Sequence, residues 1–463
     1  MKRIEKDLLG EKEINNNIYY GINTLRAIEN FGSRVKTNIN LIYGIVEIKK
    51  AAAIINNEIG ILLSEIKDSI VFACDEILTG EYNDQFVVDA LQGGAGTSTN
   101  MNVNEVIANI ALEKLGHKKG EYDIIHPMNH VNLSQSTNDV YPTGLKIASI
   151  RQLRLLADEY SLIQETLQEK ENEFSNDIKL GRTQLMDAVP ITFGQMFGSF
   201  ARVASRDRWR IYKVEERLRV MNIGGTAVGT GINADQKYIF KITSLLQRQT
   251  GLGLSRSEFP LDTTQNQDVF VEVSGMIKTA ASSLIKICND LRFLASGPSA
   301  GLGEIILEPV QQGSTIMPGK VNPVILECAV QSAMKVIAND SIITHAASSG
   351  NFELNAFMPA IADAILESLE VLTNTISMLR TKVFESIKIN RDKGLENVNN
   401  SIALATALIN HLGYDEASMI AKESHKTKRT IREIVLDKEL LSNEELDNIL
   451  NVFELTKVGI PGK

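Results

Sequence analysis

The sequence predicts a mostly α-helical protein with a central bundle of long helices. Ten of its 463 residues are proline, and four long stretches contain none. These stretches are 143–189, 191–259, 324–358 and 360–460. Alternation of polar and apolar residues, which is typical of strands, is scarce, and no β-α-β succession emerges. Helices should therefore dominate the fold.

Three segments carry apolar residues spaced three and four apart, the pattern of one helix face. They are, in chain order, Ile147, Ile150, Leu153, Leu156, Tyr160, Ile163 and Leu167; Val269, Val273, Met276, Ala280, Leu284, Ile287, Leu291 and Leu294; and Ile365, Leu369, Leu372, Ile376, Leu379 and Val383. Each stripe predicts a helix of roughly 25 residues, about 40 Å long, and such helices should pack side by side in an elongated bundle. If one bundle cannot cover every apolar stripe, the uncovered faces would pack against other subunits in a homo-oligomer.

We divide the chain into three domains around this bundle. Residues 1–138 form a mixed, mainly helical N-terminal domain, 139–394 the long-helix bundle, and 395–463 a small helical C-terminal domain. Three domains agree with the length, since a domain usually holds about 150 residues.

Charge and hydropathy exclude two classes of partner. The 48 Lys and Arg against 57 Asp and Glu give a net charge of −9, and no basic cluster is dense enough to neutralise a run of phosphates. Nucleic acid is therefore not an expected partner. The N-terminal residues 1–7 are charged throughout, and no uncharged apolar run reaches the roughly 18 residues of a membrane span. We expect no membrane partner and a cytoplasmic location.

The cysteines and histidines do not suggest a metal site. Cys74, Cys288 and Cys328 lie far apart in apolar surroundings, which predicts buried thiols in a reducing compartment. His126 and His130 have the spacing of helical ligands, but Pro127 makes a shared helical face improbable.

Four segments stand out because they are polar, nearly uncharged and rich in Gly, Ser, Thr and Asn. They are 93–100, 134–139, 181–184 and 312–323. All but the third precede a predicted helix, whose free N–H groups could bind carboxylate or phosphate. Any one segment alone is more often a helix cap than a site, but four together favour a site. Asn322 before Pro323 suits an N-cap with proline at the first helical position.

Nucleotide-binding motifs do not fit these segments. Gly313 and Gly319 enclose five residues, and Val321 follows Lys320 where a P-loop requires Ser or Thr. Residues 94–96 lack the third glycine of a dinucleotide fingerprint. Neither ATP nor NAD is therefore expected.

The loop from Gly313 to Pro323, with the sequence GSTIMPGKVNP, closely resembles the signature loop of the aspartase/fumarase superfamily. The resemblance begins at Arg3 to Gly10, passes through the four polar segments in family order, and continues to His411 to Tyr414. It implies a homotetrameric lyase that releases fumarate, with a three-domain fold whose long helices assemble into a tetrameric helical core. It also implies active sites shared between subunits.

Two branches of the superfamily compete. Leu8-Leu9-Gly10, residues 24–31 and residues 116–122 resemble the aspartase branch, as does Ser136-Thr137-Asn138, where fumarases typically carry Ser-Ser-Asn. The fumarase pattern has at position 184 a histidine that is implicated in a charge relay. Here the residue is Gln184, and a glutamine cannot relay a proton. Residues 350–355 and the C-terminal domain are closer to fumarases.

We weigh position 184 most heavily. The resemblance then implies reversible deamination of L-aspartate to fumarate and ammonia through an aci-carboxylate intermediate. The alternative is a class II fumarate hydratase that interconverts fumarate and L-malate.

The resemblance also carries over the site residues. It implies that Ser314 is the base, acting as its oxyanion. Apart from the resemblance, we expect no cofactor and no metal site built by the protein. The implied substrate contacts are Thr97, Ser136, Thr137, Asn138, Thr183, Gln184, Thr315, Lys320 and Asn322. No histidine stands near Ser314 in sequence, so loop N–H groups, Lys320 and a helix N-terminus must stabilise the oxyanion. Glu327 resembles the relay glutamate and, with Gln184 as partner, is expected to orient rather than relay.

Two interpretations lie outside this class. An inactive member of the superfamily, kept as a structural protein, should have lost Ser314 or Lys320, and both are present. A purely helical scaffold would explain the apolar stripes but would leave the four polar segments without a purpose.

Overall fold

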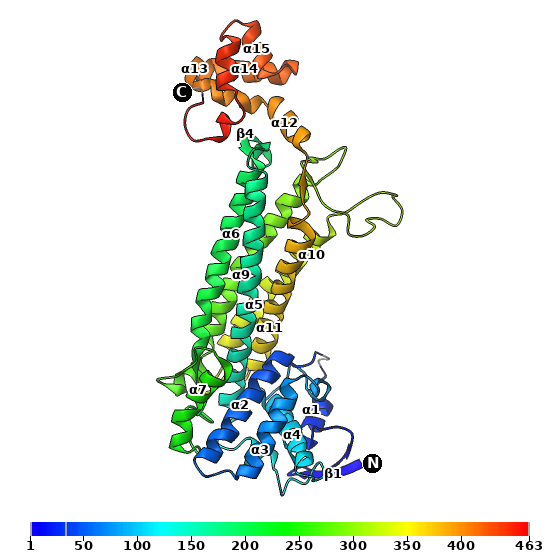
Figure 1. The fold of residues 1–463 in the computed structure, drawn as a ribbon, viewed down its shortest axis with the longest axis vertical. Coiled ribbons are helices and arrows are strands. Elements are labelled where there is room, and N and C mark those ends of the chain that lie inside the picture. The colour runs from blue at the N-terminus through cyan, green and yellow to red at the C-terminus, as the bar shows by residue number, and fades with distance from the viewer. Residues whose placement is uncertain (1, 33–34, 462–463) are drawn as a thin grey trace. The chain divides into compact units, whose positions relative to one another are not determined.

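The computed structural model describes residues 2–32 and 35–461 and divides into two compact units. Unit 1 comprises Met1–Ala157, Trp209–Ala281 and Met334–Thr373. Unit 2 comprises Asp158–Arg208, Ser282–Ala333 and Asn374–Lys463. Several long helices begin in a segment of one unit and end in a segment of the other, so each unit contains parts of them (Figure 1).

The long helices confirm the mostly helical prediction. They are α5 (Thr137–Glu173), α6 (Phe193–Val214), α9 (Asp268–Leu294), α10 (Val324–Ser348) and α11 (Met358–Leu379). The three predicted stripes lie on α5, α9 and α11, the last ending in a π-helical turn at Arg380–Phe384. Every residue of the first stripe is buried.

Polar contacts join these helices side by side within each unit. In unit 1, Ser274 and Lys278 of α9 donate to Asp340 of α10 at 2.8 and 2.6 Å. In unit 2, Arg292 of α9 lies 3.7 Å from Glu327 of α10. The helices of each unit therefore pack as neighbouring members of a bundle.

Helix α5 is longer than predicted, at 37 residues, because it begins before Pro142. A proline inside a helix has no N–H for the carbonyl four residues earlier, here that of Asn138. The amide of Asn222 donates to this carbonyl at 3.0 Å and replaces the missing helical bond. The helix can therefore continue through the proline.

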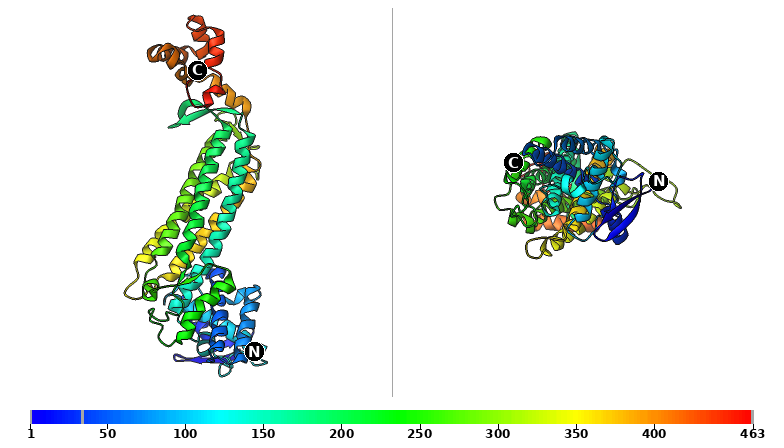
Figure 2. Two further views of the ribbon diagram at one scale, coloured as in Figure 1. Left: turned by 60° about the vertical axis from the view of Figure 1, so that its left-hand side comes forward. Right: turned by 90° about the horizontal axis from the view of Figure 1, so that it is seen from below.

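Unit 1 also holds the remaining N-terminal elements. Its further helices are α1 (Ile22–Asn30), α2 (Ile39–Glu58), α3 (Ser64–Leu78), α4 (Thr97–Lys114), α7 (Gln236–Thr250), α8 (Pro260–Gln265) and a π-helix (Pro127–Val131). Its strands are β1 (Lys2–Asp7) and β2 (Gly10–Asn15), which are antiparallel, and β5 (Val220–Met221) and β6 (Ser255–Arg256), which are parallel. Helices α2, α3 and α4 pack together, as the blue and cyan ribbons of Figure 2 show.

Unit 2 combines two strand pairs with the C-terminal helices. The antiparallel pairs are β3 (Ile178–Thr183) with β4 (Met186–Thr192), and β7 (Ile305–Ile306) with β8 (Lys388–Ile389). The helices are α12 (Arg391–Asn399), α13 (Ile409–Leu412), α14 (Tyr414–Thr427), α15 (Ile431–Asp437) and α16 (Asn443–Ile449). Ile178 and Leu180 of β3 belong to the buried cluster of these helices, so the hairpin is anchored in the C-terminal core.

Two further predictions can be compared with the structure. Within residues 2–32 and 35–461, no helix is long and apolar enough to cross a membrane. Cys74 and Cys288 are buried, as predicted, but Cys328 is exposed. It lies on α10 between the buried Leu326 and Ala329 and points away from their side of the helix, so the prediction was wrong for this residue.

Candidate active site

The signature loop is closed at its base by two hydrogen bonds. The N–H of Gly313 donates to the carbonyl of Lys320 at 3.0 Å, and the amide of Asn322 donates to the carbonyl of Gly313 at 2.5 Å. A Cβ on Gly313 would lie 2.2 Å from that Lys320 oxygen, so only glycine permits this closure. Helix α10 begins at Val324, one residue later than predicted, and the amide of Asn322 closes the loop. Pro323 thus precedes the helix instead of opening it, so the predicted cap position was wrong by one residue.

Ser314 is held inside this closed loop. Its Oγ accepts hydrogen bonds from the backbone N–H groups of Ile316 at 3.2 Å and Met317 at 3.0 Å. Two N–H groups directed at one oxygen stabilise negative charge on it. The loop therefore supplies the environment that a serine oxyanion requires.

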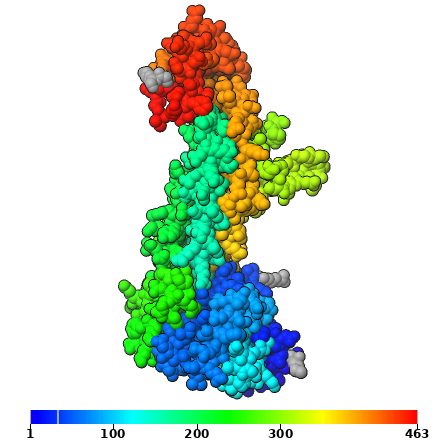
Figure 3. All heavy atoms as spheres, in the orientation of Figure 1, coloured from blue at the N-terminus to red at the C-terminus, as the bar shows by residue number. Residues whose placement is uncertain are grey.

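The rest of the loop faces solvent within this chain. Thr315 and Lys320 are exposed, and residues 309–321 curve around a hollow of about 700 Å³. Figure 3 shows this segment, in yellow-green, extending away from the helices of its own unit. The loop's side chains are thus free to contact a substrate or another subunit.

Thr183 and Gln184 lie at the tip of the β3–β4 hairpin. Thr183 pairs with Met186, so Gln184 and Leu185 form a two-residue turn, with φ angles of 54° and 66°. Turns with two positive φ angles favour Asn-Gly, and each residue with a Cβ costs about 1–2 kcal/mol there. The backbone at Gln184 is therefore strained. Strained backbone conformations of this kind are often found at functional sites.

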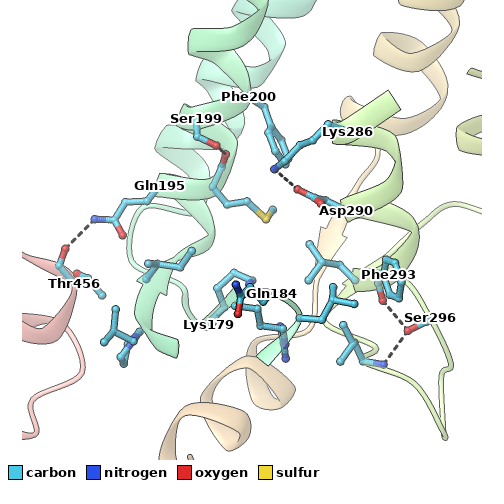
Figure 4. Close-up of a pocket in the computed structure, with 18 of the residues that line it drawn as sticks. Lys179, Gln184, Gln195, Ser199, Phe200, Lys286, Asp290, Phe293, Ser296 and Thr456 are labelled. Carbon is cyan, nitrogen blue, oxygen red and sulfur yellow. Dashed lines mark hydrogen bonds and ion pairs between the residues drawn. The ribbon is translucent and has the colours of Figure 1, made fainter. Parts of the chain in front are cut away.

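Gln184 also lines a cavity of about 1250 Å³ in unit 2. Figure 4 shows the cavity between the hairpin, α6 and α9, with Lys179 and Gln184 on the hairpin and Lys286 and Asp290 on α9. Among the residues the structure describes, no hydrogen bond or ion pair joins Gln184 to Glu327. Glu327 pairs instead with Arg292.

Unit 1 brings the other two predicted segments together, as the N-termini of α4 and α5. Thr97 is the first residue of α4, and its hydroxyl donates to the carbonyl of Gly94 at 2.8 Å. The preceding Gly96 has a φ of 93°, and a Cβ there would lie 2.2 Å from the ring of Tyr141 on α5. The two helix N-termini are therefore in van der Waals contact, which only a glycine allows.

Polar contacts fix the α5 terminus against α4. The amide of Asn100, on α4, donates to the Thr137 hydroxyl at 3.1 Å. Ser136 Oγ accepts from the N–H of Asn138 at 3.3 Å, and the amide of Asn138 donates to the carbonyl of Ala227 at 2.8 Å. Uncharged donors and helix N-termini thus gather where a carboxylate can bind.

Two buried charged residues support this terminus, and sequence reasoning missed their role. Lys49 of α2 is fully buried and donates to Asn132 at 2.8 Å and to Gln135 at 2.9 Å. Burial lowers the pKa of Lys49 to about 7. Asp139 accepts from the N–H of Ser136 at 2.9 Å, and burial raises the pKa of its carboxyl to about 6. The available signals were the lysine pair 49–50 before the alanine run 51–53 and the place of Asp139 at the end of the predicted segment 134–139.

The predicted residues therefore fall into two groups. Thr97, Ser136, Thr137 and Asn138 belong to unit 1, whereas Thr183, Gln184, Ser314, Thr315, Lys320 and Asn322 belong to unit 2. Across the described ranges, no hydrogen bond or ion pair links the hairpin tip, residues 183–184, to the signature loop.

Comparison with known proteins shows similarity along the whole chain. Residues 10–338 match the family described as lyase, and residues 404–457 match the one described as fumarase C C-terminus. An aspartate ammonia-lyase of a Bacillus species is 46% identical over 100% of this chain and 99% of its own length. The aspartate ammonia-lyase of Escherichia coli K12 is 43% identical over 98% of this chain and 96% of its own length.

Two solved structures are similar throughout. The fumarate lyase:delta crystallin from Brucella melitensis has a TM-score of 0.96 at 43% identity, covering 99% of this chain and 100% of that one. A class II fumarase from Schistosoma mansoni has a TM-score of 0.94 at 31% identity, and the match covers 98% of this chain and 99% of that one.

The buried Lys49 predicts a measurable pH dependence of stability. Its pKa falls from 10.5 to about 7 on burial, so between these values the unfolded chain binds more protons than the folded one. Stability must then rise with pH in this window. We expect the free energy of unfolding of the wild type, relative to Lys49→Met, to increase from about pH 7 to about pH 9, by at most about 1.4 kcal/mol per pH unit. Denaturant titrations at one protein concentration measure it, and a difference that stays constant or falls would contradict the prediction.

Proposed function

This chain belongs to the lyase family, and we propose that it catalyses the reversible deamination of L-aspartate to fumarate and ammonia. It is a carbon–nitrogen lyase with aspartate ammonia-lyases among its relatives at 43–46% identity over nearly the full chain. The observation that carries the mechanism is the pair of backbone N–H groups on Ser314 Oγ, at 3.2 and 3.0 Å.

The chemistry requires a proton to leave the carbon next to a carboxylate. That carboxylate then carries a second negative charge, in the aci-form, until the carbon–nitrogen bond breaks. Ser314, as its oxyanion, takes the proton, while the Ile316 and Met317 N–H groups that stabilise the oxyanion lower the cost of forming it. The amino group of the substrate is already protonated, so it takes the electrons of the carbon–nitrogen bond and departs as neutral ammonia.

Substrate binding depends chiefly on uncharged donors. Eight candidate residues offer hydroxyls or amides, which can bind carboxylates without a permanent positive field. They are Thr97, Ser136, Thr137, Asn138, Thr183, Gln184, Thr315 and Asn322. Such a field would stabilise the bound substrate as strongly as the intermediate. Lys320, on the same closed loop as Ser314, supplies the one cation, and its charge favours the doubly negative carboxylate.

We further propose that the enzyme is a homotetramer in which different subunits contribute to one site. The division of the site residues between two units of the chain supports this proposal. So do large apolar side chains that remain exposed on the long helices, among them Leu155, Leu162, Trp209, Phe293, Met334 and Ile342. A second copy of the chain could cover them.

The same proposal includes the domain division at 138 and 394 and a cytoplasmic location. The start of α5 at Thr137 and the separate buried cluster of the C-terminal helices support the division. The three cysteines, all free, are compatible with a reducing compartment.

Fumarate hydration is the second candidate. It is favoured by the match of residues 404–457 to the fumarase C C-terminus and by the similarity to a class II fumarase. Hydroxide, however, needs an acid to protonate it as it leaves. The amide of Gln184 cannot carry a proton at neutral pH, so this group cannot supply that step.

The choice of leaving group can be tested with purified protein. Because Gln184 cannot act as an acid, we expect deamination of L-aspartate and a preference over L-malate of at least ~10³, or about 4 kcal/mol. Ultraviolet absorbance of fumarate follows both reactions. Comparable specificity constants, or turnover of malate alone, would favour the fumarase assignment.

Subunit sharing can be tested by mixing two variants of strongly reduced activity. Ser314→Ala removes the base and Thr183→Val removes a donor, and we expect Ser314→Ala to lose on the order of 10²–10⁴ in turnover. In a mixed tetramer, some sites would combine an intact loop from one chain with an intact hairpin from another. Co-refolding the two variants should therefore restore part of the activity.

The matched control mixes Ser314→Ala with Lys320→Met. Both changes lie in one closed loop, so each site carries one or the other and no activity should return. If the first mixture also stays inactive, with mixed tetramers confirmed by mass, each site is built within one chain.

A further inference from the structure

Glu304 is a buried carboxylate at the junction of three elements of unit 2. Its side chain is inaccessible to solvent, and its backbone is fixed on both sides. Its N–H donates to the carbonyl of Leu294, at the end of α9, at 2.9 Å. Its carbonyl accepts from the N–H of Asn390, before α12, at 2.8 Å. The backbone of Glu304 is therefore fixed in position, and its side chain can bind residues of neighbouring elements.

The side chain of Glu304 binds the β3–β4 hairpin and α12. Its Oε1 accepts from Arg182 Nη2 at 2.5 Å and from the amide of Asn397 at 2.9 Å, and its Oε2 lies 3.4 Å from Lys179 Nζ. Burial alone would raise the pKa of this carboxyl, but the Arg182 hydrogen bond and the charges of Lys179 and Arg182 outweigh it and lower the pKa. Glu304 is therefore a charged anchor for two cations of one hairpin.

Arg182 directly precedes the candidate substrate residues Thr183 and Gln184. The pairing of β3 with β4 shifts register between Leu180 and Arg182, an irregularity that re-aims the following side chains. The turn beyond it, Gln184–Leu185, is strained at both residues, with φ angles of 54° and 66°. A strained turn persists only where its surroundings hold it, and Arg182 is the residue through which Glu304 reaches it.

Stability alone does not explain this ion pair. Arg182 Nη1 and Glu304 Oε2 are buried without a hydrogen-bond partner, so the pair is not saturated. Buried ion pairs contribute little net stability and are in some proteins retained because they fix a geometry. The chain also runs from Glu304 through β7 toward the loop that holds Ser314. Glu304 is thus linked to the hairpin through Arg182 and precedes the signature loop by a few residues of chain.

We propose that Glu304 is a positioning residue of the reaction, which holds Thr183 and the Gln184–Leu185 turn, through Arg182, in the geometry that receives substrate. The inference rests on the proposed function, since it takes Thr183 and Gln184 to be substrate contacts. Glu304 itself does not touch substrate. Its removal should displace the turn, and small displacements of binding groups reduce rates by up to about 10²-fold.

The test combines Glu304→Gln with Thr183→Val in a double-mutant cycle on kcat/KM. Glu304→Gln should lower kcat/KM by about 10- to 100-fold while the tetramer still forms. Thr183→Val should then cost much less in the Glu304→Gln background than in the wild type, because the hydroxyl is already misplaced. A residue that served stability alone would leave the cost of Thr183→Val unchanged.

Arg391→Ala provides the matched control. Arg391 and Asp177 form an ion pair, at 2.6 Å, that also joins α12 to the chain beside β3. This pair lies at the opposite end of β3 from the turn, and Arg391 is largely exposed, so its loss should change neither kcat/KM nor the cost of Thr183→Val.

If Glu304→Gln fails to assemble, Arg182→Lys takes its place in the cycle, because it keeps the buried charge but loses the guanidinium. An equal cost of Thr183→Val in both backgrounds, or a wild-type kcat/KM in the Glu304 or Arg182 variant, would overturn the proposal. The cycle is run on whichever of L-aspartate and L-malate the wild type converts. Failure of the aspartate assignment is therefore visible in the wild type and separate from failure of the positioning role.

Discussion

The chemistry proposed for this chain depends on the hydrogen bonds that converge on Ser314 Oγ. A serine hydroxyl is a poor base, and no histidine accompanies it in the loop. Each N–H bond to a charged oxygen is worth about 1.5–3 kcal/mol, so the two backbone donors lower the cost of the oxyanion substantially. These donors stay in place because the loop is closed between Gly313 and Lys320, where only glycine fits.

The candidate substrate-facing groups are mostly uncharged, whereas the residues that support them from the protein interior are charged types. The candidate groups that face substrate are hydroxyls and amides, with Lys320 as the single cation. The buried charges lie behind them: Lys49 and Asp139 support the α5 terminus, and Glu304 supports the hairpin. Such groups, hydrogen-bonded and removed from water, fix their neighbours without adding a field that would bind substrate and intermediate equally.

The sequence was sufficient for the features that depend on local pattern. The apolar stripes predicted α5, α9 and α11, because a helix must bury one face whatever its partners. The signature loop could be located because its composition is polar and nearly uncharged and because its sequence resembles the loop of a known superfamily. By contrast, the passage of α5 through Pro142 depends on Asn222, which is distant in sequence, and no local rule predicts that contact.

The supporting residues were equally invisible in the sequence. Lys49 and Glu304 look like ordinary charged residues, and their importance comes only from burial among tertiary neighbours. The Gln184–Leu185 turn lacks the Asn-Gly signal of its type, so its positive φ angles could not be predicted. Asn322 was assigned to a helix cap because Pro323 follows it, and its hydrogen bond to the Gly313 carbonyl forms only when the loop closes.

We infer that one site combines the α4 and α5 N-termini of one subunit with a signature loop from another copy of the chain. A structure of the assembled enzyme with bound fumarate tests it most directly. We expect a carboxylate on Thr97 and Ser136 to Asn138 of one subunit, with Ser314 Oγ of another within about 3.5 Å of the reacting carbon. Fumarate bound away from Ser314, or a complete site within a single chain, would contradict it.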